Sequence, residues 1–343
     1  MEMPRKVLLL CALIGLILIG GCAKRNTAWQ EPSILSFVRE IPVIGNPADI
    51  SFDADNLYIS LDQGGIMMVN TANWQTNWWT QVLPGGADAQ LINVRRASLV
   101  PQHKLLFLGE FVAADKIRIV DVSDPDSLRL IESITGGTDG LSQIFFKAIP
   151  NPTDANIIEG FFGAGRSLHY CRFNGSLYLG TTWSIEAPAT VSGFDTTDQL
   201  VVIAAQQRGL AIYNRANQQK ISEIAVPGEA LAVKVSGNYA YVACRQGGFY
   251  IVDITNPATP VLKDGYDTTG YATSVDLHDN LALVSSGGGG VYVFDISNPN
   301  SVVLKEALTS AGYTNNAVFY EDQVLVSSRD NGVQIYSLDL PGR

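Results

Sequence analysis

The sequence GVYVFDISNPN at residues 290–300 is an apolar strand pattern followed by a polar turn. Nearly the same pattern occurs as GFYIVDITNPA at 248–258 and as KIRIVDVSDPD at 116–126. In each copy an aspartate ends the strand: Asp121, Asp253 or Asp295. We predict a structural role for these aspartates, because a turn Asp accepts backbone N–H groups and the following Pro fixes φ. The alternative is a ring of carboxylates around a metal ion.

Four weaker copies of this strand end extend the repeat over most of the chain. They end at Asn70, Arg172, Asn214 and Ser337. The seven anchors are spaced by 51, 51, 42, 39, 42 and 42 residues, and a period of this size indicates a modular array. The third copy departs from the pattern, since Arg172 replaces the aspartate.

Each unit contains four short strand patterns. In unit five they are EALAVKVSG, YAYVACRQ, GFYIVDIT and PVLKDGYDT, within residues 229–268. Runs rich in β-branched and aromatic residues, separated by Gly, Asn, Asp and Pro, indicate strands joined by tight turns. The middle strands are apolar on both faces, which is typical of sheets that lie between two neighbours. A closed ring protects the ends of such an array.

The two ends of the chain complement each other. Unit seven has three strand patterns, and residues 33–41 (SILSFVREI) resemble the missing fourth one. We therefore predict an all-β fold, a seven-bladed β-propeller of four-stranded antiparallel blades. The N-terminal strand closes the ring, and residues 33–343 form a single domain.

The N-terminal residues resemble a secretory signal. Arg5 and Lys6 precede an apolar run at Val7–Ile19, which is too short to cross a bilayer as a mature helix. We predict a signal peptide over residues 1–21.

The segment IGGC, ending at Cys22, resembles a bacterial lipobox. This resemblance implies cleavage before Cys22, acylation of its thiol and a tether over residues 22–32. Ala23 stands where an Asp would favour the inner membrane, so we expect anchoring at the outer membrane, with the body facing the periplasm or the outside. The alternative is an ordinary signal peptide with an incidental cysteine.

Composition excludes several classes of protein. Without residues 1–21 the chain has 32 acidic and 21 basic side chains, a net charge of −11, whereas nucleic-acid binding needs a basic surface. Motifs for a catalytic serine or a phosphate-binding loop are absent, and the three histidines lie in different units. We expect no nucleic acid, cofactor or metal.

Cys171 and Cys244 fall in units three and five, too far apart for a disulfide, so we predict two buried free thiols.

The segments YIVDITNPATP, VYVFDISNP and IRIVDVSDP resemble the LVIVD repeat of bacterial and archaeal surface proteins. The resemblance covers residues 227–340 well and 104–130 less closely. It implies a β-propeller, a surface or envelope location and protein interaction, and it implies no catalytic residues.

The turns between the second and third strands carry a set of basic residues on one face of the predicted ring. They are Lys116, Arg166, Arg208, Arg245 and Arg329. Clustered arginine suits carboxylate or phosphate groups, so these residues form a candidate ligand face. The alternative is that they are solvated turn residues, offset by Asp62 and Asp330.

A second candidate is the segment NWQTNWWT at residues 73–80, which contains Trp74, Trp78 and Trp79. An exposed tryptophan cluster marks an interaction patch. The alternative, which we favour, is that these rings pack at the rim of the blade.

From these observations we expect an outer-membrane-anchored, monomeric, non-catalytic scaffold that binds an envelope protein or polymer. The alternative is a protein that binds a small molecule or an anionic ligand, or a hydrolase, working at the Arg-bearing face of the central channel.

Overall fold

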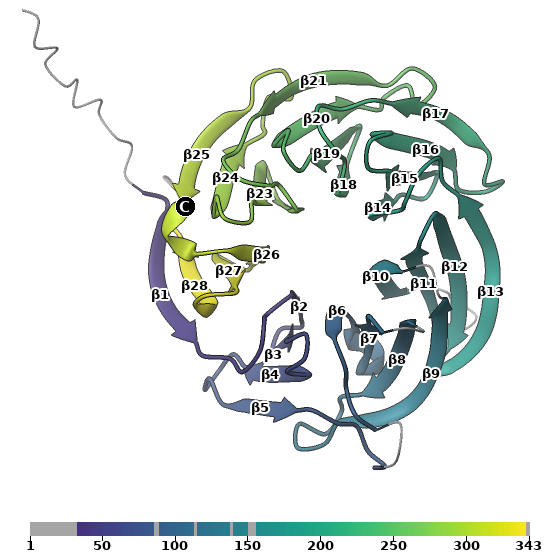
Figure 1. The fold of residues 1–343 in the computed structure, drawn as a ribbon, viewed down its shortest axis with the longest axis vertical. Coiled ribbons are helices and arrows are strands. Elements are labelled where there is room, and N and C mark those ends of the chain that lie inside the picture. Colours follow the sequence, from purple (N-terminus) through teal and green to yellow (C-terminus); the bar gives the residue numbers. More distant parts are fainter. Residues whose placement is uncertain (1–32, 86–88, 113–114, 138–139, 150–155, 341–343) are drawn as a thin grey trace, which may run out of the picture. The chain divides into compact units, whose positions relative to one another are not determined.

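Seven four-stranded antiparallel sheets surround a central axis, which confirms the predicted seven-bladed propeller (Figure 1). The computed structural model describes residues 33–85, 89–112, 115–137, 140–149 and 156–340. Ile34–Arg343 is one compact unit. The predicted signal peptide, Cys22 and the tether lie outside the described residues. In the described part of the chain, no helix has the length and apolar character to cross a membrane.

We letter the strands of each blade A to D from the centre outward. In blades one to four they are β2 (Asp49–Phe52), β3 (Asn56–Ser60), β4 (Ile66–Asn70) and β5 (Thr76–Trp79); β6 (Val94–Val100), β7 (Leu105–Glu110), β8 (Asp115–Asp121) and β9 (Arg129–Gly137); β10 (Leu141–Ala148), β11 (Ile157–Ala164), β12 (Ser167–Asn174) and β13 (Leu177–Glu186); β14 (Gly193–Thr196), β15 (Leu200–Ala204), β16 (Leu210–Asn214) and β17 (Lys220–Ile224). In blades five to seven they are β18 (Ala232–Ser236), β19 (Tyr239–Ala243), β20 (Phe249–Asp253) and β21 (Val261–Tyr266); β22 (Ser274–His278), β23 (Leu281–Ser285), β24 (Val291–Asp295) and β25 (Val303–Leu308); β26 (Thr314–Tyr320), β27 (Gln323–Ser328), β28 (Gly332–Leu338) and β1 (Leu35–Ile41). Two short 3₁₀ turns, η1 (Pro101–His103) and η2 (Thr309–Ala311), lie between strands.

The N-terminal strand closes the ring as predicted. Strand β1 is strand D of blade seven and pairs antiparallel with β28, from Leu35 opposite Leu338 to Ile41 opposite Val333. The first and last described strands of the chain therefore share one sheet, and the ring has no open sheet at either end.

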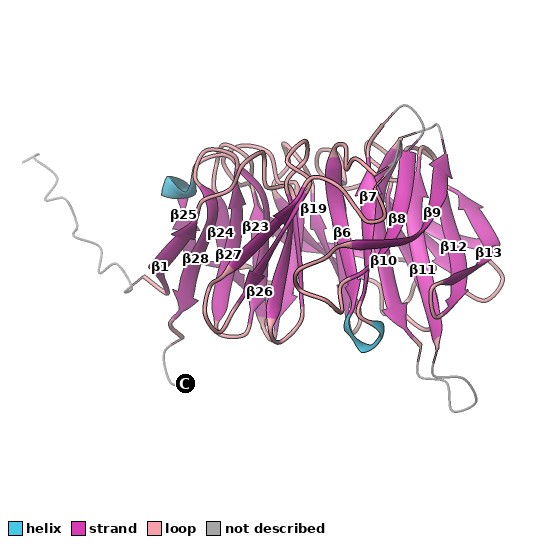
Figure 2. Cartoon of the chain, turned by 90° about the horizontal axis from the view of Figure 1, so that it is seen from below, coloured by secondary structure: helices cyan, strands magenta, loops and turns pink. Residues whose placement is uncertain are grey.

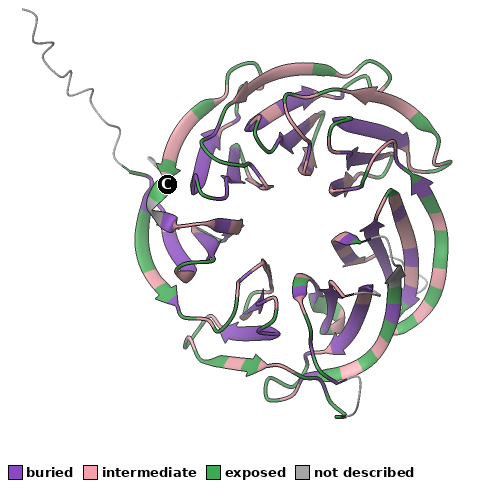
Figure 3. Cartoon of the chain, in the orientation of Figure 1, coloured by how far each residue is buried: buried purple, intermediate pink, exposed green. Residues whose placement is uncertain are grey.

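The apolar core lies between the blades. Among the described residues it divides into seven clusters, one at each junction of neighbouring blades. Strands B and C are mostly buried, strands A are buried in part, and the outer strands D are half-buried to exposed (Figure 3). Phe107 of blade two stacks on Phe146 of blade three with 3.9 Å between ring centroids. Gly160 makes room for this stack, because a Cβ there would lie 2.1 Å from the Phe146 ring.

The turns of the blades lie on two opposite faces (Figure 2). The BC face carries the turns between strands B and C, together with the connections between blades. The AB face carries the turns between A and B and between C and D. In five blades the turn between strands B and C ends in a glycine, such as Gly248 at φ 82°, where a Cβ would lie 2.2 Å from the carbonyl oxygen of Tyr266. Glycine allows the turn to approach the outer strand this closely.

Blade two contains a buried ion pair. Arg118 Nε lies 2.8 Å from Glu110 Oε2, and both side chains are almost completely buried. The pair also anchors the connection between β5 and β6: Arg118 Nη2 donates to the Gln90 carbonyl, and Glu110 accepts a hydrogen bond from the Ile92 amide. The pair thus adds hydrogen bonds to a segment whose Val82 and Leu91 pack in the core between blades one and two.

Candidate functional site

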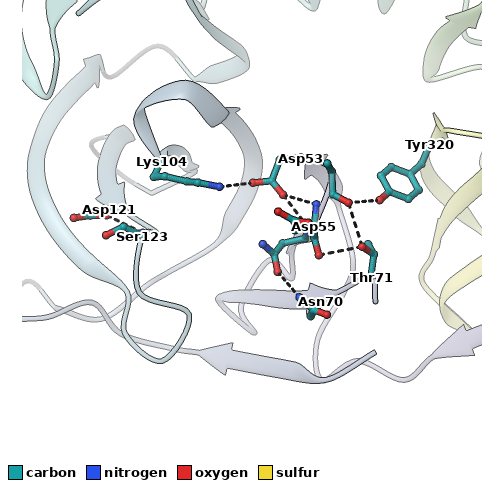
Figure 4. Close-up of polar contacts among 10 residues, drawn as sticks. Asp53, Asp55, Asn70, Thr71, Lys104, Asp121, Ser123 and Tyr320 are labelled. Atoms are coloured by element: carbon teal, nitrogen blue, oxygen red, sulfur yellow. Dashed lines mark hydrogen bonds and ion pairs between the residues drawn. The ribbon is translucent and has the colours of Figure 1, made fainter. Parts of the chain in front are cut away.

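The three repeated aspartates each bond to their own turn on the AB face. Asp121 Oδ1 accepts a hydrogen bond from the Ser123 amide at 2.8 Å (Figure 4). Asp253 and Asp295 accept from the amides two residues further on, at 2.9 Å each. These hydrogen bonds, from Thr255 and Ser297, hold the pKa of Asp253 and Asp295 below the usual range. The carboxylates are thus engaged in the way a structural turn residue requires.

The same position has a similar role where the aspartate is replaced by asparagine. Asn70 Oδ1 accepts from the amides of Ala72 and Asn73, and Asn214 Oδ1 does the same for its own turn. An amide oxygen accepts these hydrogen bonds as a carboxylate does.

Polar contacts on the AB face also join neighbouring blades (Figure 4). Lys104 Nζ of blade two lies 3.2 Å from Asp53 Oδ2 of blade one. Tyr320 of blade seven donates its hydroxyl proton to the Ala54 carbonyl of blade one, at 3.1 Å. These side chains are engaged in contacts within the ring.

Blade three replaces the turn aspartate by an ionic cluster. The carboxylate of Glu159, which is almost completely buried, lies 3.0 Å from Lys147 Nζ and 2.5 Å from Arg215 Nη2 of blade four. Arg172 pairs with Glu159 across strands β11 and β12. Its Nε is buried and has no hydrogen-bond partner.

The predicted basic residues lie at the BC ends of five different blades, and most of them have a local partner. Arg166 lies 3.3 Å from Glu186, Arg208 lies 2.6 Å from Glu223 and Arg245 lies 2.6 Å from Glu229. The hydrogen bond from Arg245 lowers the pKa of Glu229. Lys116 is the second residue of β8. Local pairing reduces the charge that these residues offer to an anion.

Arg329 and Arg245 belong to a continuous strip on the BC face of blades five to seven. We call it the Tyr–Arg strip; it comprises Arg245, Tyr271, Gly288, Tyr313 and Arg329. Arg245 lies 5.4 Å from the Tyr271 ring centroid, and Arg329 lies 4.1 Å from that of Tyr313. The exposed turn at Gly288 lies between them, because the Tyr271 amide donates to the Ser286 carbonyl and Thr314 to that of Gly287. The sequence analysis did not identify the two tyrosines.

The three tryptophans lie in different environments. Trp74 stacks under Arg39 at 4.1 Å and packs against the cluster between blades seven and one. Trp79 packs against the cluster between blades one and two. Trp78 is 42% exposed and donates its indole N–H to the Gly64 carbonyl. Consecutive residues of a strand face opposite ways, so Trp78 and Trp79 do not share a surface.

Cys171 and Cys244 are free and buried, in blades three and five, as predicted. Burial raises the pKa of each thiol to about 12. A thiol in this state is a poor nucleophile, which argues against a catalytic role for either residue.

The A strands enclose a central cavity of about 440 Å³. Its charged lining residues are Asp49, Arg96, Lys234 and Asp276. Asp49 Oδ2 accepts from the Ala97 amide of blade two, and its Oδ1 accepts from Asn316 Nδ2 of blade seven. Burial in the channel wall raises the pKa of Asp49, against the lowering effects of Arg96 and of these hydrogen bonds.

Side chains of one blade bind the free edge of strand A in the next. Ser51 accepts from the Leu99 amide, Ser98 from Phe146, Asp195 from Val235 and Asp276 from Phe319, at 2.7 to 2.9 Å. An unpaired strand edge carries unsatisfied N–H groups, and these hydrogen bonds satisfy them. This ring of acceptors was not predicted from the sequence, although the acceptors share one position when the A strands are aligned by register.

No group of three or more His, Cys, Asp or Glu side chains in the described residues has the arrangement of a metal site.

Comparison with known families supports the repeat. The model of the LVIVD repeat matches residues 111–135, 227–268 and 269–309, which lie in blades two, five and six. No curated protein has significant sequence similarity to this chain.

Many solved structures share the fold. The WD40 β-propeller domain of Doa1 is 12% identical, with a TM-score of 0.69 over 88% of this chain and 97% of that one. The structure of U3-55K is 13% identical, with a TM-score of 0.68 over 89% and 98%. The computationally designed Ika8 protein is 12% identical, with a TM-score of 0.58 over 87% and 98%. At these identities the likeness shows the propeller fold alone.

Proposed function

We propose that this chain is an outer-membrane lipoprotein whose propeller acts as a non-catalytic scaffold for another envelope protein. The lipobox resemblance at Cys22 and Ala23 supports the anchor, and the LVIVD repeats support a role in protein interaction. The closed ring has no open sheet that needs a second copy, which supports a monomer.

We propose that the partner binds at the Tyr–Arg strip, and the composition of the strip is the main support for this. Tyrosine and arginine are enriched among the residues that dominate binding energy at protein interfaces. Tyr271 is 51% exposed, and the neighbouring turn at Gly288 presents backbone groups without a side chain. Glu229 and Asp330 lie beside the two arginines, so the strip has little net charge. A protein partner suits this combination of aromatic and polar groups better than a polyanion does.

The test is crosslinking in intact envelopes followed by affinity purification. We expect a stoichiometric protein partner with the wild-type chain, and loss of most of it in a Tyr271→Ala/Tyr313→Ala double variant. Trp78→Ala is the matched control, because it removes an exposed aromatic residue outside the strip. Cys22→Ser tests the anchor separately, since it should release the chain from the membrane fraction.

Equal capture by the wild-type chain and the double variant would exclude the strip. Loss of capture in Trp78→Ala instead would move the interaction site to the tryptophan segment. Recovery of an envelope polymer without a protein would replace the proposed partner.

A further inference from the structure

The ring of acceptors around the channel has one exception that carries a positive charge. Ser51, Ser98, Asp195 and Asp276 each pair with the third residue of strand B in their blade. In blade five this position is Lys234, which pairs with Tyr241. An ammonium group donates hydrogen bonds and accepts none, so Lys234 is unable to replace the acceptors.

The amide that Lys234 would serve lies in blade six. The amides bound at the other junctions each belong to the residue directly after this position, such as Leu99 after Ser98 and Val235 after Lys234. In blade six that residue is Leu277, opposite Ala282. By register, a backbone donor in β22 therefore faces the position of a cationic donor in β18, whereas four other junctions combine a donor with an acceptor.

The other two exceptions are uncharged. In blades three and seven the same position, directly before an amide that the preceding blade binds, is occupied by Phe145 and Val318. After Phe145, the Thr196 amide is satisfied by Asp195 Oδ1 at 2.8 Å. Among the described residues, the junction of blades five and six is the one that combines an amide without such an acceptor with a positive charge.

The cavity beside this junction is suited to a small ligand. Lys234 lines it, and within the described residues its ammonium group has no ion pair or hydrogen bond. The volume of about 440 Å³ is within the range of small-molecule sites. Asp49 and Asp276 also line the cavity and offset the charges of Arg96 and Lys234, so the lining favours a ligand with a single negative charge over one with several.

We propose that Lys234 and the Leu277 amide form an anion site in the channel wall, which takes the single carboxylate or phosphate group of a small molecule. The anion would supply the acceptor that the ring lacks at this junction. This site is separate from the Tyr–Arg strip, and it would hold a ligand whether or not a protein partner binds on the BC face.

The test follows the Leu277 amide by NMR in the purified full chain, with butyrate and inorganic phosphate as probes. We expect a saturable shift of this amide with at least one probe. Lys234→Gln should weaken that binding by roughly tenfold or more, because a hydrogen bond to a charged group is lost. Lys220→Gln, which removes an exposed lysine on an outer strand, should leave it unchanged. A response to butyrate alone would identify a carboxylate site, and a response to phosphate alone a phosphate site.

Lys234→Asp provides a second readout that does not depend on the ligand. An aspartate at this position should accept from Leu277, as Asp195 and Asp276 accept from their neighbours. We expect slower hydrogen exchange at the Leu277 amide and no probe binding. The proposal is overturned by equal probe affinity in the wild-type and Lys234→Gln chains, by the lack of any saturable shift, or by faster exchange in Lys234→Asp.

Discussion

Blades three and six each form a four-stranded sheet, but they differ in the side chain that occupies the motif position of strand C. In blade six, Asp295 closes its turn and the sequence matches the LVIVD repeat. In blade three, Arg172 has the same register and lies beside the ion pairs of Glu159, and the repeat model does not match. Strand B is buried along its whole length in both blades. The buried strand, and not the turn motif, is therefore what the two blades share.

The largest effect that tests this comparison is expected from removal of the ion pairs of Glu159. Glu159→Gln leaves Lys147 and Arg215 without their carboxylate next to Arg172. Removing one partner from a fully buried ion pair costs about 3 to 5 kcal/mol, and solvent at the half-exposed Lys147 places the cost here at the lower end of that range. We expect a loss of that size in the free energy of unfolding, measured by urea denaturation. Glu186→Gln is the control, because its side chain is 64% exposed and its ion pair lies on the surface.

A small effect of Glu159→Gln would mean that blade three is held by its apolar packing alone. The two blades would then differ only at their surfaces, and Arg172 would be a neutral replacement for aspartate.

Packing between blades gives the next effect. Gly160→Ala introduces a Cβ that would lie 2.1 Å from the Phe146 ring, so the stack on Phe107 must shift. Overpacking of a core costs about 1 to 3 kcal/mol. We expect this loss in thermal or urea unfolding. Gly85→Ala should be close to neutral, because a Cβ there meets no atom within 4 Å.

The turn aspartate of blade six gives the smallest effect and depends on pH. Asp295→Ala removes the acceptor for the Ser297 amide and should cost about 1 kcal/mol at pH 7. Asp295→Asn should cost much less, since Asn70 and Asn214 make the same hydrogen bonds in their blades.

The sign of the pH effect follows from the lowered pKa of Asp295. Its contribution to stability is present above the ordinary value of 3.8 and is lost as the pH falls through the folded-state pKa. The difference between the wild-type and Asp295→Ala chains should shrink between pH 4 and pH 2 in urea titrations. A difference that stays constant over this window would show that the carboxylate charge has no part in the turn.

The sequence predicts the architecture well because the fold depends on short, local patterns. The seven strand ends from Asn70 to Ser337 give the number of blades, and residues 33–41 give the closing strand. Arg172 replaces the aspartate of the motif. Its spacing still identifies it, because it lies 51 residues after Asp121 and 42 residues before Asn214.

The candidate surfaces are harder to predict, because they depend on contacts between distant segments. The carboxylates of Glu186, Glu223 and Glu229 neutralise arginines that lie 15 to 20 residues away in the sequence, and these contacts form only after the strands pair. The separation of Trp78 from Trp79 follows from strand alternation and was predictable. The exceptional position of Lys234 among the acceptors is recognised only when the A strands are aligned by register.

The pairing of β1 with β28 sets an order on how the molecule is made. Leu35 emerges from the ribosome about three hundred residues before its partner Leu338, as the register of the two strands requires. Until β28 has been synthesised, β1 has no partner strand, because the edge of blade seven with which it pairs has not yet been made. The ring therefore closes only after β28 has been made, and a chain interrupted before β28 leaves β1 without a partner strand and exposed to other molecules.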